Sequence, residues 1–356
     1  MLKIGNVTFP SPYILAPLSG ISDLPFRMIN RSFGCKFAFS EMISCRALVS
    51  RNKKTLDMLS TIPSDRPLGI QLLGNDTEFI RGALEVLREY VFDIIDFNAA
   101  CPVNKVTNRG EGASLLKEPR RLSELLKVLV ENSSAPVTVK IRSGWDETCI
   151  NARDVALYAQ DSGIKALFIH GRTREQGYKG GVDYQVIREV KEALAIPLIA
   201  SGDVLSPQLI KKMFDETGCD GVVIARGALG NPWIFKDAVE FMRSGTIPQR
   251  RCRDEIVNTM VTHLNLCSDY HGEMIGIKLF RKFFVWYTKG LKDIKPLREK
   301  AFHAKTKDNM METINKLRET KRDESAPTGF NNLLAEELIP SSFQADTLPP
   351  LNPLLK

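Results

Sequence analysis

The sequence has few of the residues that build a metal site. Among 356 residues there are four histidines and seven cysteines, and no two cysteines stand in a Cys-x-x-Cys pair. A zinc site needs clustered cysteine and histidine ligands, so we expect no metal. Scattered, odd-numbered thiols are typical of a reducing compartment, and we expect a cytoplasmic protein.

Long apolar runs are also missing. No stretch approaches the ~20 apolar residues that span a bilayer, so a membrane protein is excluded. The N-terminus shows no charged segment followed by an apolar core, so we expect no secretion signal. Hydrophobic residues make up 43% and charged residues 26% of the chain, a balance that excludes wholesale disorder and a fibrous repeat.

Charge is unevenly distributed along the chain. Of the net +7, residues 1–240 contribute only +2, whereas residues 241–320 hold 16 basic and 9 acidic side chains. Residues 321–356 contribute −2. A nearly neutral part beside a strongly basic one indicates two domains with different partners.

Short apolar runs alternate with amphipathic stretches over the first 240 residues. The runs predict buried strands at 13–16, 37–39, 68–72, 94–97, 137–141, 166–169, 198–200 and 222–225. Helical spacing predicts helices at 77–89, 120–131, 152–160, 184–193 and 208–215. Eight such alternations predict a (β/α)8 TIM barrel. The alternative is an open doubly wound sheet. The sequence lacks the Gly-rich fingerprint that usually follows the first strand of that fold.

The pattern changes after Pro248. Helical patterns at 253–270, 278–289 and 306–319, without strands, predict an all-α bundle of three to four helices. Five prolines within residues 321–356 indicate an unstructured tail. We therefore expect a barrel domain at 1–243, a basic helical domain at 244–320 and a Pro-rich tail at 321–356.

Polar residues stand at the carboxyl end of nearly every predicted strand. In a (β/α)8 barrel these positions form the active site. Turns with glycine follow the last two strands, at 201–203 and 226–232, and predict a phosphate site. Lys140 is a cation in an apolar strand and needs a partner, either a carboxylate or the polar edge of a flavin.

Cys101 follows a predicted strand and precedes a polar, glycine-containing loop at 103–114. A free thiol titrates near ~8.5, so at neutral pH it can donate a proton. It could equally act as a nucleophile, although that role requires an adjacent base. The residues by themselves leave these two roles open.

Several motifs resemble those of the tRNA-dihydrouridine synthases, most of all the bacterial B-type subfamily. In family order they are APLSGISDLPFR at 16–27, SEM at 40–42, QL at 71–72, NAACP at 98–102, GASLL at 112–116, KIRSGW at 140–145, HGRT at 170–173 and GNPWIF at 230–235. KLFRK at 278–282 and WY at 286–287 resemble the tRNA-binding domain of that family.

The resemblance implies an FMN enzyme that reduces the C5=C6 bond of a tRNA uridine, with NADPH or NADH as electron donor and no obligate protein partner. Hydride would come from N5 of reduced FMN and the proton from Cys101. FMN contacts carry over to Pro17, Leu18, Ser19, Gln71, Lys140, His170, Ser201, Gly202, Asp203, Ala225 and Arg226. Weaker substrate assignments are Asn98, Arg172, Lys278, Arg281 and Lys282.

Three positions depart from the family pattern. Ala100 stands where glycine is usual, and it would be strained if the backbone there needed a positive φ. Ser201 and Ala225 replace the more frequent asparagine and glycine. These changes concern local geometry rather than the class of enzyme.

This interpretation gives the basic helical region a role in binding tRNA phosphates. A uridine in folded tRNA must be unstacked at a cost of a few kcal/mol, which phosphate contacts can offset. The cations of that region include Arg250, Arg251, Arg253, Lys278, Arg281, Lys282, Lys289, Lys292 and Lys295. The alternatives are a flavin enzyme acting on a small pyrimidine-like substrate and a non-catalytic RNA-binding barrel.

Overall fold

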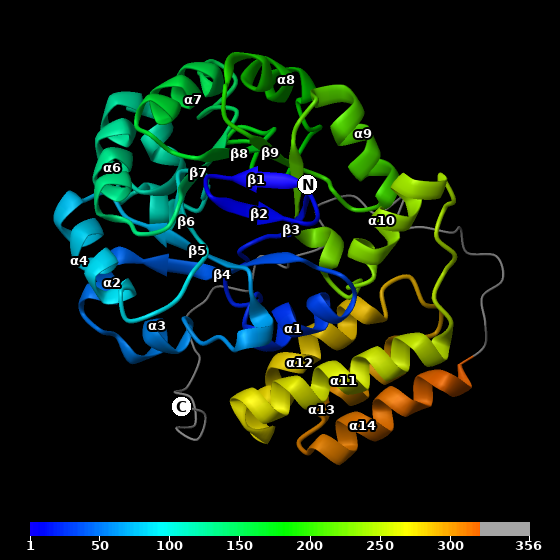
Figure 1. Ribbon diagram of the computed structural model, residues 1–356. Coiled ribbons are helices and arrows are strands. Elements are labelled where there is room, and N and C mark those ends of the chain that lie inside the picture. The colour runs from blue at the N-terminus through cyan, green and yellow to red at the C-terminus, as the bar shows by residue number, and fades with distance from the viewer. Residues whose placement is uncertain (321–356) are drawn as a thin grey trace.

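Eight parallel strands close into a barrel (Figure 1). The computed structural model describes residues 1–320, so the tail predicted at 321–356 lies outside the described residues. The strands are β3 (Tyr13–Leu15), β4 (Phe37–Ser44), β5 (Leu68–Leu73), β6 (Ile94–Asn98), β7 (Val137–Arg142), β8 (Ala166–His170), β9 (Leu198–Ser201) and β10 (Gly221–Ile224). Each pairs with the next, and β10 closes onto β3. The predicted (β/α)8 barrel is confirmed.

Helices surround the barrel (Figure 1). They are α1 (Leu24–Ser32), α2 (Cys45–Val49), α3 (Lys53–Asp57), α4 (Thr77–Leu87), α5 (Asn104–Thr107), α6 (Pro119–Asn132), α7 (Ala152–Asp161), α8 (Tyr184–Ala193), α9 (Pro207–Thr217) and α10 (Ile234–Ser244). Apolar faces at helical spacing turn inward, as the buried Ile80, Leu84 and Leu87 of α4 show. Asp76 and Ser206 cap the first turns of α4 and α9 through their side chains.

A short N-terminal hairpin closes one end of the barrel. Its strands β1 (Leu2–Ile4) and β2 (Val7–Phe9) pair antiparallel. Their buried apolar side chains join the cluster that fills the barrel interior, and the Phe9 ring stacks on Phe37 with centroids 4.2 Å apart. Phe37 begins β4, so the hairpin covers the amino ends of the strands. The hairpin does not cover the carboxyl ends of the strands, where a functional site can form.

Four further helices pack together beside the barrel (Figure 1). They are α11 (Arg253–His271), α12 (Glu273–Tyr287), α13 (Lys295–His303) and α14 (Lys307–Asn315). α11 packs against α1, and the rings of Phe26 on α1 and Phe283 on α12 stack with centroids 5.7 Å apart. The predicted helical bundle after the barrel is thereby confirmed. No helix within residues 1–320 is long and apolar enough to cross a bilayer.

Candidate active site at the carboxyl ends of the strands

Strand register brings most of the predicted site residues side by side. Asn98 at the end of β6 is the direct partner of Lys140 on β7, and His170 at the end of β8 is the partner of Ser201 on β9. Gln71 on β5 is paired with Asp96 on β6. Arg226 follows β10 in a short 3-10 turn. Parallel strands thus present these side chains at one edge of the barrel, as predicted from the strand ends.

A row of hydrogen bonds links three neighbouring strands. Thr138 Oγ1 donates to Asp96 Oδ1 at 2.6 Å, and Gln71 Nε2 donates to Asp96 Oδ2 at 2.7 Å. Asn98 Nδ2 donates to Gln71 Oε1 at 2.8 Å. A carboxylate can only accept, so Asp96 fixes the orientation of the Gln71 amide, which in turn fixes that of Asn98. Sequence reasoning missed Thr138 and noted Asp96 only as a polar residue at a strand end, although a carboxylate inside a buried strand signals such a network.

Asn98 extends this hydrogen-bond network to the Cys101 backbone. Its Oδ1 accepts hydrogen bonds from the N–H of Ala100 at 3.0 Å and of Cys101 at 2.8 Å. Arg142 Nε donates to the Ala100 carbonyl at 2.7 Å. Ala100 is not among the described residues with positive φ, so the strain considered for an alanine at this position does not arise. These three hydrogen bonds therefore fix the backbone from which the Cys101 side chain projects.

Burial raises the pKa of the Cys101 thiol above its usual value, an effect that the Arg142 charge and the Val103 N–H only partly oppose. The side chain is nevertheless partly exposed at the barrel mouth. The thiol is therefore protonated at neutral pH and remains accessible.

Lys140 is a partly buried cation with an incomplete set of partners. Among residues 1–320 its ammonium makes no hydrogen bond and no ion pair within 4 Å. Its pKa is lowered to about 8, because burial, together with the Arg142 charge, outweighs the opposing effect of the Asp96 charge. Burial raises the pKa of Asp96 to about 6, against the hydrogen bonds from Thr138 and Gln71 and the Lys140 charge. A ligand with an electron-rich edge would complete the Lys140 environment.

His170 is neutral in this setting. Burial lowers its pKa well below the usual value, and the charges of Arg142, Lys140, Arg172 and Arg226 lower it further. A concentration of cations around a neutral imidazole favours an anionic ligand.

Asp203 is the carboxylate that joins two of these arginines. It accepts from Arg172 through both carboxylate oxygens and from Arg226 Nη2 at 2.9 Å. The backbone φ is 48° at Asp203 and 125° at the preceding Gly202. A Cβ on Gly202 would lie 2.8 Å from the Val182 side chain. Glycine is therefore required at 202, in a turn that brings backbone close to the site. Ser201 Oγ donates to the Ile169 carbonyl at 2.9 Å.

The segment after β3 forms another part of the rim. Pro17 and Leu18 are half-buried and Ser19 is exposed. Leu18 N–H donates to Ser22 Oγ at 2.8 Å. Ala16 N–H donates to the Ile224 carbonyl at 3.0 Å, which sets this segment beside Ala225. The φ of Ala225 is −108°, so its backbone does not need the glycine that is frequent at this position.

Three predicted substrate residues lie outside this cluster, on α12. Lys278 is exposed. Arg281 Nη2 donates to the Ala304 carbonyl at 2.9 Å. The Lys282 ammonium donates to the Gly20 carbonyl, so it faces the barrel.

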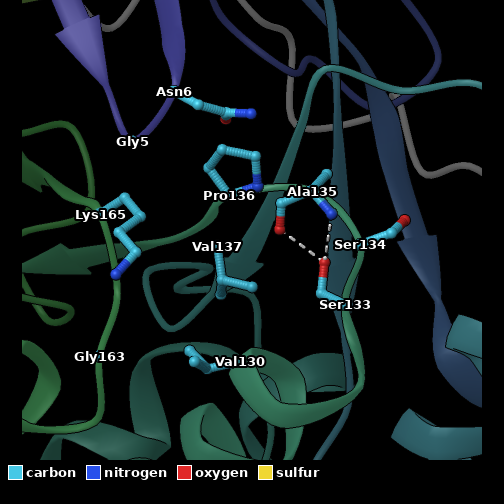
Figure 2. A pocket seen from close by; sticks show the side chains of 10 residues that line it. All are labelled: Gly5, Asn6, Val130, Ser133, Ser134, Ala135, Pro136, Val137, Gly163 and Lys165. Atoms are coloured by element: carbon cyan, nitrogen blue, oxygen red, sulfur yellow. Dashed lines mark hydrogen bonds between the residues drawn. The ribbon is translucent and has the colours of Figure 1, made fainter.

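A separate hollow lies at the other end of the barrel (Figure 2). It is lined by residues around the start of β7, including Pro136, Val137 and Lys165. The hydroxyl of Ser133 is bonded within its own turn, to Ala135. No group of three or more His, Cys, Asp or Glu side chains in residues 1–320 is arranged to hold a metal ion.

A family model described as "Dihydrouridine synthase (Dus)" matches residues 14–323. A probable tRNA-dihydrouridine synthase of Rickettsia conorii is 35% identical over 292 residues, which cover 82% of this chain and 88% of the relative. A tRNA-dihydrouridine synthase B of Vibrio parahaemolyticus is 36% identical over 288 residues, or 81% of this chain and 89% of the relative.

Among solved structures, a 6-hydroxypseudooxynicotine amine oxidase from Pseudomonas geniculata is similar in fold. The TM-score is 0.54 at 12% identity, covering 72% of this chain and 52% of that chain. This likeness concerns the fold alone.

Proposed function

The chain belongs to the dihydrouridine synthase family, and we propose that it reduces uridine in tRNA to 5,6-dihydrouridine, with FMN as its flavin and NADPH or NADH as the electron donor. The observation that carries the proposal is the placement of Cys101 at the barrel mouth, on a backbone fixed by Asn98 and Arg142. Relatives named for this activity match more than four fifths of the chain.

The residues at the mouth fit a flavin mononucleotide. Lys140, without a hydrogen-bond partner in residues 1–320, and the Gln71 amide, oriented by Asp96, suit the polar edge of the ring. The turn at Ser201, Gly202 and Asp203, with Ala225, Arg226 and the neutral His170, suits the ribityl chain and phosphate. Pro17, Leu18 and Ser19 would lie against the ring. When bound and reduced, the flavin supplies the hydride for uridine C6.

Cys101 supplies the proton to C5. Its raised pKa keeps the thiol protonated at neutral pH, as a general acid requires. A nucleophilic thiol needs a neighbouring base, whereas the groups that act on this thiol in residues 1–320 are the Val103 N–H and the charges of Arg142 and Glu111. The acid role is therefore favoured over the nucleophile role.

We assign the tRNA contact to the helical region, residues 244–320, and the chemistry to the barrel, residues 1–243. Unstacking a uridine costs a few kcal/mol, and cations that neutralise tRNA phosphates offset it. Asn98 and Arg172 are assigned nearest the uracil, although Arg172 is already bonded to Asp203 and to the carbonyls of Lys179 and Gly180.

The test uses purified protein loaded with FMN. Unmodified tRNA transcript is expected to accelerate reoxidation of the NADPH-reduced flavin under anaerobic conditions and to acquire dihydrouridine, whereas uracil and uridine are not. Equal reoxidation by free uracil would support a small-substrate oxidoreductase instead. Colourless protein that takes up no flavin but binds tRNA would support the non-catalytic alternative.

A further inference from the structure

Both polar groups of Gly20 are held by ionisable side chains from different parts of the fold. The Gly20 N–H donates to Glu41 Oε2, and the Gly20 carbonyl accepts from Lys282 Nζ. Gly20 directly follows Pro17, Leu18 and Ser19, the residues assigned to the flavin ring. We call Gly20, Glu41 and Lys282 the Gly20 clamp.

The two ionisable members reach Gly20 from different elements of the fold. Glu41 lies on β4 where the pairing with β5 shifts register, between Phe39 and Met42. Lys282 lies on α12, in the helical region. Burial lowers the pKa of Lys282, while the charges of Asp23 and Glu41 oppose that effect. The clamp therefore joins strand β4 of the barrel to the helical region through a single residue, Gly20.

A second contact fastens the same segment. His271 Nε2, at the end of α11, lies 2.7 Å from Asp23 Oδ2. Asp23 Oδ1 also accepts from the Phe26 N–H at 3.0 Å and so caps α1. Residues 20–23 are thus bonded to α11 at one end and to α12 at the other.

We propose that Glu41 and Lys282 are positioning residues that set the conformation of the flavin-facing segment 17–19, and that Lys282 does not serve as a tRNA phosphate contact. A partly buried ammonium that already bonds a carbonyl would have to give up that bond and its ion environment to reach a phosphate. The consequence is that the position of the helical region, where tRNA is proposed to bind, determines how the flavin loop is held. The flavin part of this inference rests on the proposed function.

The test compares Lys282→Met with Lys278→Met, a matched control because Lys278 is on the same helix but exposed. In Lys282→Met, amide hydrogen exchange of a peptide covering residues 17–22 is expected to be about tenfold faster without tRNA. The visible flavin spectrum should shift and FMN should dissociate about tenfold more readily, since one charged hydrogen bond to the segment is lost. The salt dependence of tRNA affinity should keep its wild-type slope.

Lys278→Met should show the reverse pattern: normal exchange at residues 17–22 and normal FMN binding, with the salt slope reduced by about 1. Lys282→Arg should recover part of the protection. Should Lys282→Met not fold, Glu41→Ala releases the other side of the clamp and is expected to accelerate the same exchange, while Glu41→Gln keeps an acceptor and is expected to retain protection.

Unchanged exchange at residues 17–22 in Lys282→Met and Glu41→Ala would overturn the proposal, as would a reduced salt slope in Lys282→Met with normal FMN binding. Wild-type protein that binds no FMN would contradict the proposed function, yet it would leave the exchange comparison interpretable.

Discussion

At the scale of single residues, the site depends on side chains that do not themselves contact a substrate. Asp96 is held by Thr138 and orients Gln71, which orients Asn98, which holds the Cys101 N–H. Arg142 secures the Ala100 carbonyl and places a positive charge near the thiol. Because each amide can bond in only one orientation here, the position of the thiol is set before any ligand arrives.

Cys101→Ala tests the acid role. It should lower the single-turnover rate of uridine reduction by a factor of about 10²–10⁴, the usual contribution of a general acid. FMN absorbance and tRNA affinity should stay at wild-type values, because the hydrogen bonds in this row involve the Cys101 backbone and not its thiol. Turnover at the wild-type rate would refute the assignment.

The pH profile separates acid from nucleophile. An acid works while protonated, and burial raises the pKa of Cys101, so the single-turnover rate should stay level up to at least pH ~8.5 and fall above that. Lys140, with a pKa of about 8, also titrates in this range. The decline should therefore be compared with Lys140→Met, which must keep it if the thiol is responsible. A rate that climbs between pH 7 and 9 would instead identify a thiolate nucleophile.

At the scale of elements, a helix cap joins the two parts of the chain, and a close helix crossing organises the helical region. α1 begins at the Asp23 cap, which also bonds His271 of α11. α11 and α12 cross tightly, since a Cβ on Gly276 would lie 2.6 Å from the Cys267 carbonyl. Asp23 therefore both caps α1 and connects the barrel to the helical region.

Two caps provide a matched comparison of this contact. Asp76 caps α4 with bonds from the N–H groups of Glu78 and Phe79, and it has no bond to the helical region. Asp76→Ala should lower the free energy of unfolding by about 1 kcal/mol. Asp23→Ala should cost about 1.5 kcal/mol more, because the bond to His271 is lost as well. Equal losses in urea unfolding would show that the His271 contact contributes nothing.

At the scale of the whole molecule, the charge distribution separates chemistry from substrate binding. The excess of basic residues lies in 241–320, yet the structure shows that these cations are not equivalent. Arg281 and Lys282 are bonded to carbonyls within the protein, whereas Lys278 and Lys295 are exposed. The exposed group is the one available to phosphates.

Replacing Lys278 and Lys295 by alanine should weaken tRNA binding and reduce the slope of log affinity against log salt by about 2 if each meets a phosphate. Oxidation of NADPH by the flavin should be unaffected, since both side chains are exposed on helices outside the barrel. An unchanged slope would place the tRNA contact elsewhere on the molecule.

The sequence predicted those parts of the fold that depend on local pattern. All eight barrel strands and the polar residues at their ends were identifiable, because buried strands and helix caps have local signals. The N-terminal hairpin was missed, since Leu2, Ile4 and Phe9 are recognisable only by what they cover. α12 begins at Glu273, five residues before its prediction, because glycine at 276 reads as a helix breaker although it serves the helix crossing.

Side-chain networks between distant segments were the least predictable part of the site. Gln71 and Asn98 could be singled out from their places at strand ends, but the bonds from Gln71 to Asp96 and from Asn98 to Gln71 depend on strand register. Lys282 could be recognised as a cation but not as a partner of Gly20, which lies 262 positions away in the chain. Such contacts require the assembled fold.

The central claim is that this protein forms dihydrouridine in tRNA. The most direct measurement is a map of dihydrouridine in tRNA from three kinds of cell: cells that have the protein, cells that lack it, and cells in which Cys101→Ala replaces the wild-type protein. We expect at least one D-loop uridine to be reduced only in cells with the wild-type protein. Identical dihydrouridine maps in all three would contradict it.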